Sequence, residues 1–298
     1  DFGMDQQKNE RKILIGITSN VIIDRVGLRG YDMISKAGFE CIDFNMQRGF
    51  YNVKDNSYNS DFLDIIEIHR RRIVECGLKI SQTHAPYYYT DYHIKNEIDL
   101  KKYLDSVDQA LKATILLQCK YMVVHPLYIL PWMKQYGINS NEELTEIMLK
   151  KILPRAKMAN VKICIENLPY DFCNDLESHK KFVSLFEDDN IKACFDYGHS
   201  KIRENNPSIH LHNMRNWIHI VHMHDNDAKI DLHDRIRVDK DRWDLIMREI
   251  YLNVNIECFS LETSGIYKKC EELDIEKELF ADYKTVKELF KTLKEFKL

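Results

Sequence analysis

The sequence lacks several features that would assign the protein to a familiar class at once. None of its eight cysteines forms a C-x-x-C pair, and several lie inside apolar runs. Such cysteines are typical of small buried side chains in a reducing compartment and not of a disulfide framework. No apolar run approaches the roughly 20 residues of a membrane-spanning helix, and the N-terminus has no signal-peptide core. These absences predict a cytoplasmic protein without a membrane partner.

Signatures of nucleic-acid and dinucleotide binding are also missing. No block of lysine and arginine stands out, and the formal net charge is −4. This charge distribution disfavours nucleic acid as a partner. A doubly wound sheet that binds dinucleotides would carry a glycine-rich turn after its first strand, whereas the sequence there reads IGITSNVI.

What the sequence does contain is an alternation of short β-like apolar runs with longer amphipathic runs. Strands buried on both faces and separated by helices indicate parallel β–α units, and eight in succession predict an α/β protein with a single (β/α)8 TIM barrel. The expected strands are residues 12–19, 41–46, 78–84, 120–126, 161–169, 191–198, 217–225 and 255–263. The expected helices are residues 21–37, 61–76, 98–118, 142–159, 174–187, 207–215, 240–250 and 273–297.

The domain organisation follows from this count. We expect one barrel domain over residues 12–298, preceded by an N-terminal tail over residues 1–11. The first three residues, before Met4, are interpreted as an addition from cloning.

Ionisable residues gather where the expected strands end, and those ends converge on one mouth of a barrel. The long irregular stretches near 47–60, 86–97, 127–141 and 226–239 also follow strands and surround this mouth. The ionisable residues at or just after strand ends are His84, His125, Glu166, Asp196, His199, His224, Asp231, His233 and Glu262.

Several carboxylates in a partly buried mouth repel one another and raise each other's pKa. Burying unpaired charge costs several kcal/mol per ion, and a divalent cation removes that cost. Histidine and carboxylate ligands suit Mn²⁺ or Zn²⁺, with Mg²⁺, Co²⁺ and Fe²⁺ as alternatives. The minimal ligand set is Glu166, Asp196, His224 and Glu262, one from each of the last four strands.

The remaining histidines receive other roles. His222 shares a strand face with His224 because side chains alternate with period two, so we expect it to line the site as a substrate contact, with a role as a metal ligand as the less favoured alternative. His219 points to the other face and is expected to be structural. Five histidines in helical or loop contexts are expected on the surface: His69, His93, His179, His210 and His212.

At these positions the sequence resembles the xylose-isomerase-like TIM-barrel superfamily, which holds sugar and sugar-phosphate isomerases and epimerases together with endonuclease IV. The motifs THAPY, YMVVHP, CIENLP, CFDYGHS, HMHDND and SLET stand in family order. The resemblance to tagatose and psicose epimerases implies one divalent ion on Glu166, Asp196, His224 and Glu262. It implies catalysis by Glu166 and Glu262 through proton transfer at a metal-bound enediolate, with a substrate contact from His199. His84, His125 and His222 are further candidates for contacts with the substrate. The implied substrate is a small sugar, sugar phosphate or polyol-derived ketone.

The resemblance to endonuclease IV supports an alternative. That enzyme holds three zinc ions with nine ligands, and this chain has a candidate at every position. The additional metal ligands would be His84, His125, His199, Asp231 and His233. Two differences from the nuclease motifs disfavour this hypothesis. DLH stands where the nuclease has Asp-Arg-His, and DRIRVDKDRW replaces its glycine-rich turn. A zinc-dependent abasic-site phosphodiesterase is therefore the second hypothesis, followed by a sugar dehydratase or a barrel that binds a metabolite without turnover. Related barrels often pair through their helices, which leaves a homo-oligomer open.

Overall fold

Eight parallel strands close into a barrel, which confirms the predicted fold class. The computed structural model describes residues 11–88, 93–204 and 206–293. Each strand pairs in parallel with the next along the barrel order β1-β10-β9-β8-β7-β6-β5-β2, and β1 pairs with β2 to close it. The barrel strands are β1 (Leu14–Thr18), β2 (Cys41–Asn45), β5 (Lys79–His84), β6 (Tyr121–Val124), β7 (Lys162–Glu166), β8 (Ile191–Asp196), β9 (Ile218–Met223) and β10 (Cys258–Leu261).

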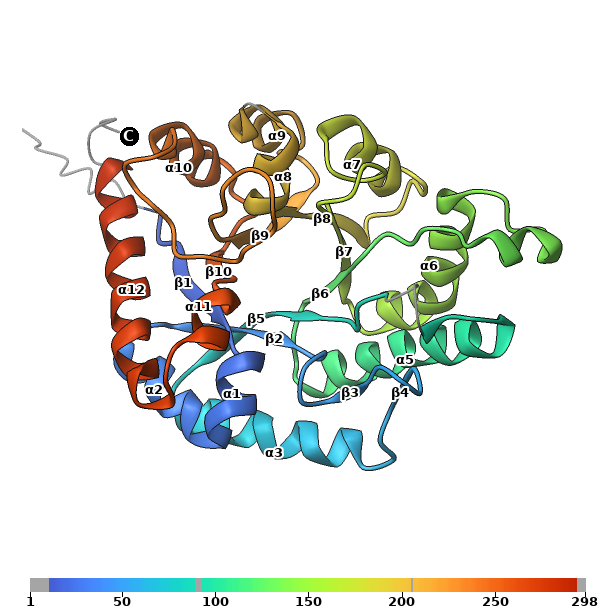
Figure 1. Ribbon diagram of the computed structural model, residues 1–298, viewed down its shortest axis with the longest axis horizontal. Helices are drawn as coiled ribbons and strands as arrows, with labels where there is room; N and C mark the ends of the chain where they lie inside the picture. Colours follow the sequence, from blue (N-terminus) through green and yellow to red (C-terminus); the bar gives the residue numbers. More distant parts are fainter. Residues whose placement is uncertain (1–10, 89–92, 205, 294–298) are drawn as a thin grey trace, which may run out of the picture.

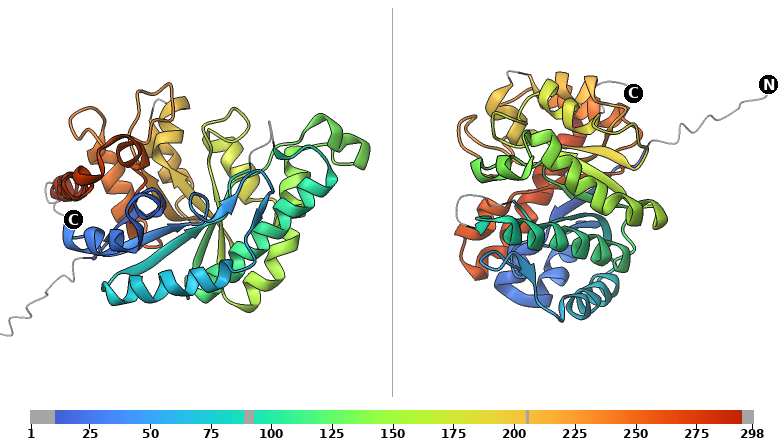
Figure 2. Two further views of the ribbon diagram at one scale, coloured as in Figure 1. Left: turned by 60° about the horizontal axis from the view of Figure 1, so that its bottom comes forward. Right: turned by 90° about the vertical axis from the view of Figure 1, so that its right-hand side faces the viewer.

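Helices surround the strands and follow one another around the barrel in chain order (Figure 1). The side views show the same ring, with the neighbouring helices α5 and α6 side by side (Figure 2). The helices are α1 (Asn20–Val26), α2 (Gly30–Ala37), α3 (Phe62–Glu75), α5 (Glu97–Leu116), α6 (Asn141–Met158), α7 (Leu176–Val183), α8 (Tyr197–Arg203), α9 (Pro207–Asn213), α10 (Trp243–Leu252), α11 (Ser264–Lys269) and α12 (Ile275–Thr292). Short 3₁₀ turns are η1 (Gly27–Arg29), η2 (Pro131–Tyr136) and η3 (Glu272–Asp274).

The structure differs from the predicted elements in a few places. The helix expected over 21–37 is broken between α1 and α2, because Gly27 adopts a φ of 68° that ends α1. The stretch 47–60, expected to be irregular, contains a small antiparallel hairpin of β3 (Tyr51–Asn52) and β4 (Ser57–Tyr58). Helices α8 and α11 were not predicted. Helix α8 follows β8 directly, and α11 begins after two residues that follow β10. Both helices carry or support residues of the site.

Apolar side chains form two separate clusters. The larger one fills the space between the strands and the helices, where α12 buries Leu279, Val286 and Leu289 against the barrel. The smaller one lies inside the barrel and consists of Tyr121, Val123, Cys164, Cys194 and Ile220. Such a filled interior is typical of TIM barrels. No helix in the described part of the chain is long and apolar enough to cross a membrane.

The cysteines behave as the sequence predicted. All eight are free thiols in the structure. Cys76 and Cys270 are partly exposed, and the other six are buried: Cys41, Cys119, Cys164, Cys173, Cys194 and Cys258.

Candidate metal centre and active site

The C-terminal ends of six neighbouring strands, β5 to β10, bring ionisable side chains together. Strand β5 ends in His84, β7 in Glu166 and β8 in Asp196. His125, His224 and Glu262 each follow within a residue of the ends of β6, β9 and β10. Because the strands are parallel, all these ends lie at the same mouth of the barrel. The predicted convergence of these positions is therefore present in the structure.

The donor atoms fall into overlapping groups, in each of which they lie within 4.8 Å of one another. We call Glu166, Asp196, His222 and Glu262 the central group. His199, His224, Asp231 and His233 form the loop group, and His84, His125 and Glu166 form the outer group. A further combination joins Cys194 to Glu166 and His222.

The predicted four-ligand set is divided between two of these groups. Glu166, Asp196 and Glu262 belong to the central group, whereas His224 belongs to the loop group. His224 Nε2 nevertheless lies 3.0 Å from Asp196 Oδ1, so Asp196 connects the two groups. His222 is the histidine of the central group, a role that the sequence left as the less favoured alternative.

Glu166 is the most heavily contacted carboxylate of the site. One of its oxygens lies 3.0 Å from His222 Nδ1, and the other lies 3.1 Å from Nε2 of both His84 and His125. Burial alone would raise the pKa of Glu166. The nearby His222 and the hydrogen bonds with His125, His222 and His84 outweigh burial and hold that pKa well below its usual range.

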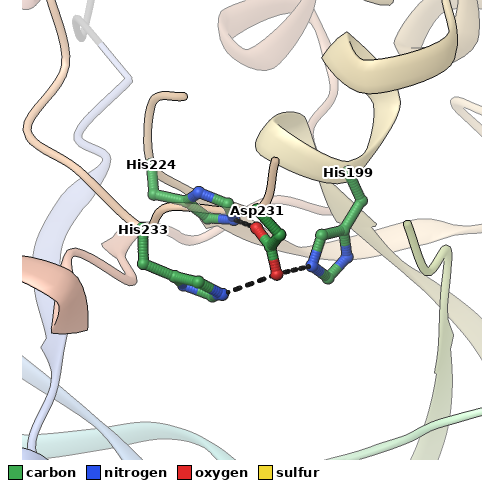
Figure 3. A group of neighbouring side chains, drawn as sticks. All are labelled: His199, His224, Asp231 and His233. Atoms are coloured by element: carbon green, nitrogen blue, oxygen red, sulfur yellow. Dashed lines mark hydrogen bonds and ion pairs between the residues drawn. The ribbon is translucent and has the colours of Figure 1, made fainter. Parts of the chain in front are cut away.

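The loop group is arranged around one carboxylate (Figure 3). Asp231 Oδ2 lies 3.1 Å from His199 Nε2 and 3.0 Å from His233 Nε2, and Asp231 Oδ1 lies 3.8 Å from His224 Nε2. Burial lowers the pKa of His233, but its hydrogen bond with Asp231 and the charge of Glu262 raise it to about 9. The structure therefore brings Asp231 and His233 to the strand-end residues, as the nine-ligand hypothesis required.

Three histidines have the hydrogen bonding expected of metal ligands. The Nδ1–H of His84, His199 and His233 donates to the backbone oxygens of Ala85, Asn167 and Glu262, at 2.7, 2.8 and 2.9 Å. Each ring then directs Nε2 at a carboxylate. A second-sphere partner on one nitrogen commonly fixes the ring so that the other can bind a metal.

The spacing of these donors fits a shared divalent ion. A lone pair on Nε2 would repel a carboxylate oxygen unless a proton or a cation lay between them. Two ligand atoms that are each about 2.1 Å from one ion lie roughly 3.0 Å apart at the 90° angle of octahedral coordination and roughly 3.4 Å apart at the tetrahedral angle. The observed separations of 3.0–3.1 Å match the octahedral value, and a hydrogen bond through a shared proton has the same length.

Gly198 at the start of α8 makes room for His224. A Cβ at Gly198 would lie 2.0 Å from His224 Cε1 and 2.4 Å from Nδ1. No residue other than glycine could be accommodated there without moving the ring. The DYGHS motif therefore supplies a ligand candidate, the space for another and the helix that carries His199.

The loop after β9, over residues 226–239, is anchored to the barrel. Asp225 and Asp234 form an antiparallel bridge, and Arg237 Nε donates to Asp225 Oδ2 at 2.8 Å. The amide of Gly265 in α11 donates to the oxygen of His233 at 3.1 Å. Residues 226–239 include no glycine, and these contacts hold Asp231 and His233 at the mouth.

A cavity of about 630 Å³ opens above the site. Its wall carries aromatic side chains, including Tyr51, Tyr88 and Tyr128. Seven predicted site residues line it: His84, His125, Glu166, His199, Asp231, His233 and Glu262. Asp196, His222 and His224 are fully buried and are not among the described residues that line the cavity. The position of His222 thus does not support its predicted contact with substrate.

Two of the histidines expected on the surface are in fact buried, so that prediction was wrong for His179 and His210. Both are completely inaccessible, and His179 Nδ1 lies 2.9 Å from His210 Nε2. His210 also contacts Glu204, which fixes α7, α8 and α9 to one another. His69 is half-buried and lies 2.8 Å from the Tyr31 hydroxyl, whereas His212 is exposed as predicted. His219 lies near the start of β9, 3.3 Å from the Tyr121 hydroxyl and away from the site.

Sequence reasoning missed two residues that organise the site. Asn167 accepts from the Asp196 amide at 2.7 Å, donates to the Asp196 oxygen at 3.0 Å and holds His199 through its own backbone oxygen. Tyr87 stacks on His125 with ring centroids 5.0 Å apart. The available signal was their position in the motifs: Asn167 directly follows Glu166 in CIENLP, and Tyr87 lies three residues after His84 in THAPYY.

The family model described as "Xylose isomerase-like TIM barrel" matches residues 31–257. The chain belongs to this family. The sequence resemblance to the superfamily is thereby confirmed, and the barrel architecture is the one the family name describes. A comparison with curated proteins finds no match.

Solved structures of sugar epimerases share the fold. An L-ribulose 3-epimerase is 17% identical, with a TM-score of 0.71 over 96% of this chain and 97% of that chain. A D-tagatose 3-epimerase-like protein is 19% identical, with a TM-score of 0.69 over 92% and 98%. A 3-keto-D-glucoside 4-epimerase from E. coli is 16% identical, with a TM-score of 0.66 over 92% and 100%.

Proposed function

We propose that the protein is a divalent-metal-dependent isomerase or epimerase of a small sugar, sugar phosphate or polyol-derived ketone. The observation that carries this proposal is the placement of Glu166 and Glu262. Both line the cavity, and their oxygens belong to the same donor group. The similarity of the fold to that of sugar epimerases supports the same class of reaction.

The two glutamates would exchange a proton with the substrate carbon. Glu166 would act as the base, because its carboxylate lines the space that the substrate would occupy. Glu262 lines the same cavity and would deliver or accept the proton from its own side. A divalent cation held by the central-group carboxylates, with His224 as the predicted fourth ligand, would supply positive charge that stabilises a developing oxyanion.

The cavity wall would position the substrate. His84, His125 and His199 line the cavity and are proposed to contact substrate oxygens. The tyrosines of the wall present flat apolar faces with polar hydroxyls, which suits a polyhydroxylated ligand. Arg48 also lines the cavity but is paired with Asp24 at 2.5 Å, and Lys268 at the rim is exposed. With one cationic side chain paired and the other exposed to solvent, the cavity wall suits a neutral sugar, which needs no positive charge for its binding.

A second candidate function follows from the three donor groups. All nine positions that resemble the endonuclease IV ligands lie in the central, loop or outer group, and Glu166 and Asp196 connect these groups. Such an arrangement would suit several zinc ions that clamp a phosphodiester during displacement. Metal analysis of protein purified without chelator separates the alternatives: one ion per chain favours the isomerase, and three favour the phosphodiesterase.

The decisive experiment is solvent hydrogen exchange into sugars. The wild-type protein loaded with Mn²⁺ should incorporate deuterium from D₂O at the carbon beside the carbonyl of its substrate. The variant Glu262→Gln should abolish this exchange while it still binds the sugar. Glu257→Gln is the matched control, because Glu257 is exposed and precedes β10. If ketoses and their phosphates show no exchange with the wild-type protein, and abasic-site DNA is incised instead, the isomerase proposal fails.

A further inference from the structure

His222 lies beneath the cavity at the centre of the donor groups. Its side chain is fully buried, and Nδ1 lies 3.0 Å from Glu166 Oε1 and 3.5 Å from Glu262 Oε2. The donors of His222, Glu166, Asp196 and Glu262 all lie within 4.8 Å of one another. The Cys194 donor is within the same distance of His222 and Glu166. His222 Nδ1 is therefore within reach of an ion that the three carboxylates share.

The other nitrogen of His222 faces a second buried carboxylate. Nε2 lies 3.8 Å from Asp43 Oδ2, and Asp43 is completely inaccessible. Neither His222 Nε2 nor either oxygen of Asp43 has a hydrogen-bond partner among the described residues. A buried carboxylate without partners is costly, and burial raises the pKa of Asp43 to about 6.

Asp43 and His222 sit in a polar layer within the barrel. Asp43 is aligned with Gln82 on the neighbouring β5, and His222 is aligned with Ser260 on β10. The amide atoms of Gln82 and the hydroxyl of Ser260 also lack partners among the described residues. A barrel interior that served only for packing would place apolar side chains there, as it does around Ile220. The polar layer thus calls for a role beyond packing.

We propose that His222 is an additional ligand of the divalent ion, bound through Nδ1, and that Asp43 is the positioning residue that holds it. This proposal depends on the metal centre described under the proposed function. A small approach of the two side chains lets Nε2–H donate to Asp43, which leaves the Nδ1 lone pair directed at the shared site. Carboxylate–histidine–metal arrangements of this kind fix the ring and increase its basicity.

The binding mode of His222 differs from that of three other histidines of the site in a way that can be measured. His84, His199 and His233 donate Nδ1–H to backbone oxygens and therefore bind an ion through Nε2. In wild-type protein loaded with ¹¹³Cd²⁺, ¹⁵N spectra of the histidine rings should show a histidine coupled to cadmium through Nδ1. Coupling through Nε2 alone would overturn the proposal without the need for any variant.

Variants test the two residues separately. Co²⁺ affinity, from chelator competition, and the visible Co²⁺ spectrum are measured for His222→Gln and Asp43→Asn. We expect His222→Gln to change the spectrum and lower the affinity, and Asp43→Asn to lower the affinity by about 10–100-fold. His219→Gln, on the same strand but away from the site, should match the wild type. A wild-type spectrum and affinity in His222→Gln would refute the ligand role, and unchanged affinity in Asp43→Asn would refute the positioning role.

The two proposals fail in different ways. A wild-type protein that exchanges sugar protons, together with a metal site insensitive to His222, would overturn only this inference. A metal site that requires His222 in a protein without activity on any ketose would overturn only the proposed function.

Discussion

The interior of the barrel changes character within two residues along β7 and β8. On β7 the inward-facing side chain changes from Cys164 to Glu166, and on β8 from Cys194 to Asp196. The lower half, toward the N-terminal ends of the strands, is a small apolar cluster that contains Ile220. The upper half contains the carboxylates and imidazoles of the donor groups. The two halves share their strands but differ in what they contribute.

The lower half is therefore expected to contribute mainly to the stability of the fold, and the upper half mainly to metal binding and catalysis. Apolar burial in the lower half stabilises the fold by about 25 cal/mol per Å² of surface removed from water. In the upper half burial disfavours charged carboxylates, and only imidazoles or a cation can compensate. Substitutions in the two halves should therefore affect different measured properties.

The largest effect is expected in the upper half, from Glu166→Gln. This change removes the proposed base and a candidate ligand that the central and outer groups share. The rate of proton exchange should fall about 10²–10⁴-fold, and bound metal should fall with it, while the far-UV circular dichroism keeps the barrel signature. Metal analysis and deuterium exchange check this, with exposed Glu257→Gln as the control. Full activity in Glu166→Gln would show that catalysis lies elsewhere.

The converse result is expected in the lower half, from Ile220→Ala. Removal of this buried side chain leaves a cavity among close-packed neighbours and should lower the free energy of unfolding by about 2–5 kcal/mol. Metal stoichiometry should remain that of the wild type, because Ile220 contributes no ligand. Denaturant titration and metal analysis of the same sample test the expected loss of stability and the unchanged metal stoichiometry. Loss of metal along with stability would mean that the two halves are not independent.

The contrast between the apolar and ionisable parts of the barrel also explains which structural elements could be predicted from the sequence. The barrel was predictable because buried strands and amphipathic helices alternate eight times. Helices α8 and α11 escaped because they have only seven and six residues and begin in the site motifs DYGHS and ETSG. Their buried first turns contain polar residues, which hide the helical pattern.

Within the site, the sequence could identify the ligand-bearing strands but not the depth of each side chain. His222 and His224 share a strand face, so period two cannot distinguish them. Their grouping depends on how the strands are staggered around the barrel, which only the structure shows. Asp43 stands alone in CIDFNM, and nothing in that run indicates that its carboxylate faces His222 across the barrel.

Removal of the metal should destabilise the protein to an intermediate extent. A cation that binds only the folded protein stabilises it by about 2.7 kcal/mol when its free concentration is 100 times Kd. Chelator should therefore lower the melting temperature of wild-type protein, and added Mn²⁺ or Zn²⁺ should restore it. Glu166→Gln should respond much less, since it binds metal weakly. An equal response in both would indicate that the ion binds outside this site.

The smallest effect is expected from a single methyl group, and it compares the two halves most directly. Gly198→Ala would push the His224 ring, because the added Cβ falls 2.0 Å from Cε1. We expect metal affinity to fall about tenfold, the lower end of the range for disturbed ligand support. Stability should change little, because alanine favours α8 by about 1 kcal/mol relative to glycine.

Gly16→Ala is the matched substitution in the lower half. The Cβ of the introduced alanine would lie 2.8 Å from Cys258 Sγ. It would therefore press on a packed side chain and not on a candidate metal ligand. We expect it to lower the free energy of unfolding by about 1–3 kcal/mol through overpacking and to leave metal affinity unchanged. Chelator competition and denaturant titration on both variants give four values. If Gly198→Ala binds metal as tightly as the wild type does, displacement of the His224 ring does not weaken metal binding. The carboxylates and the other histidines would then be the ligands of the ion.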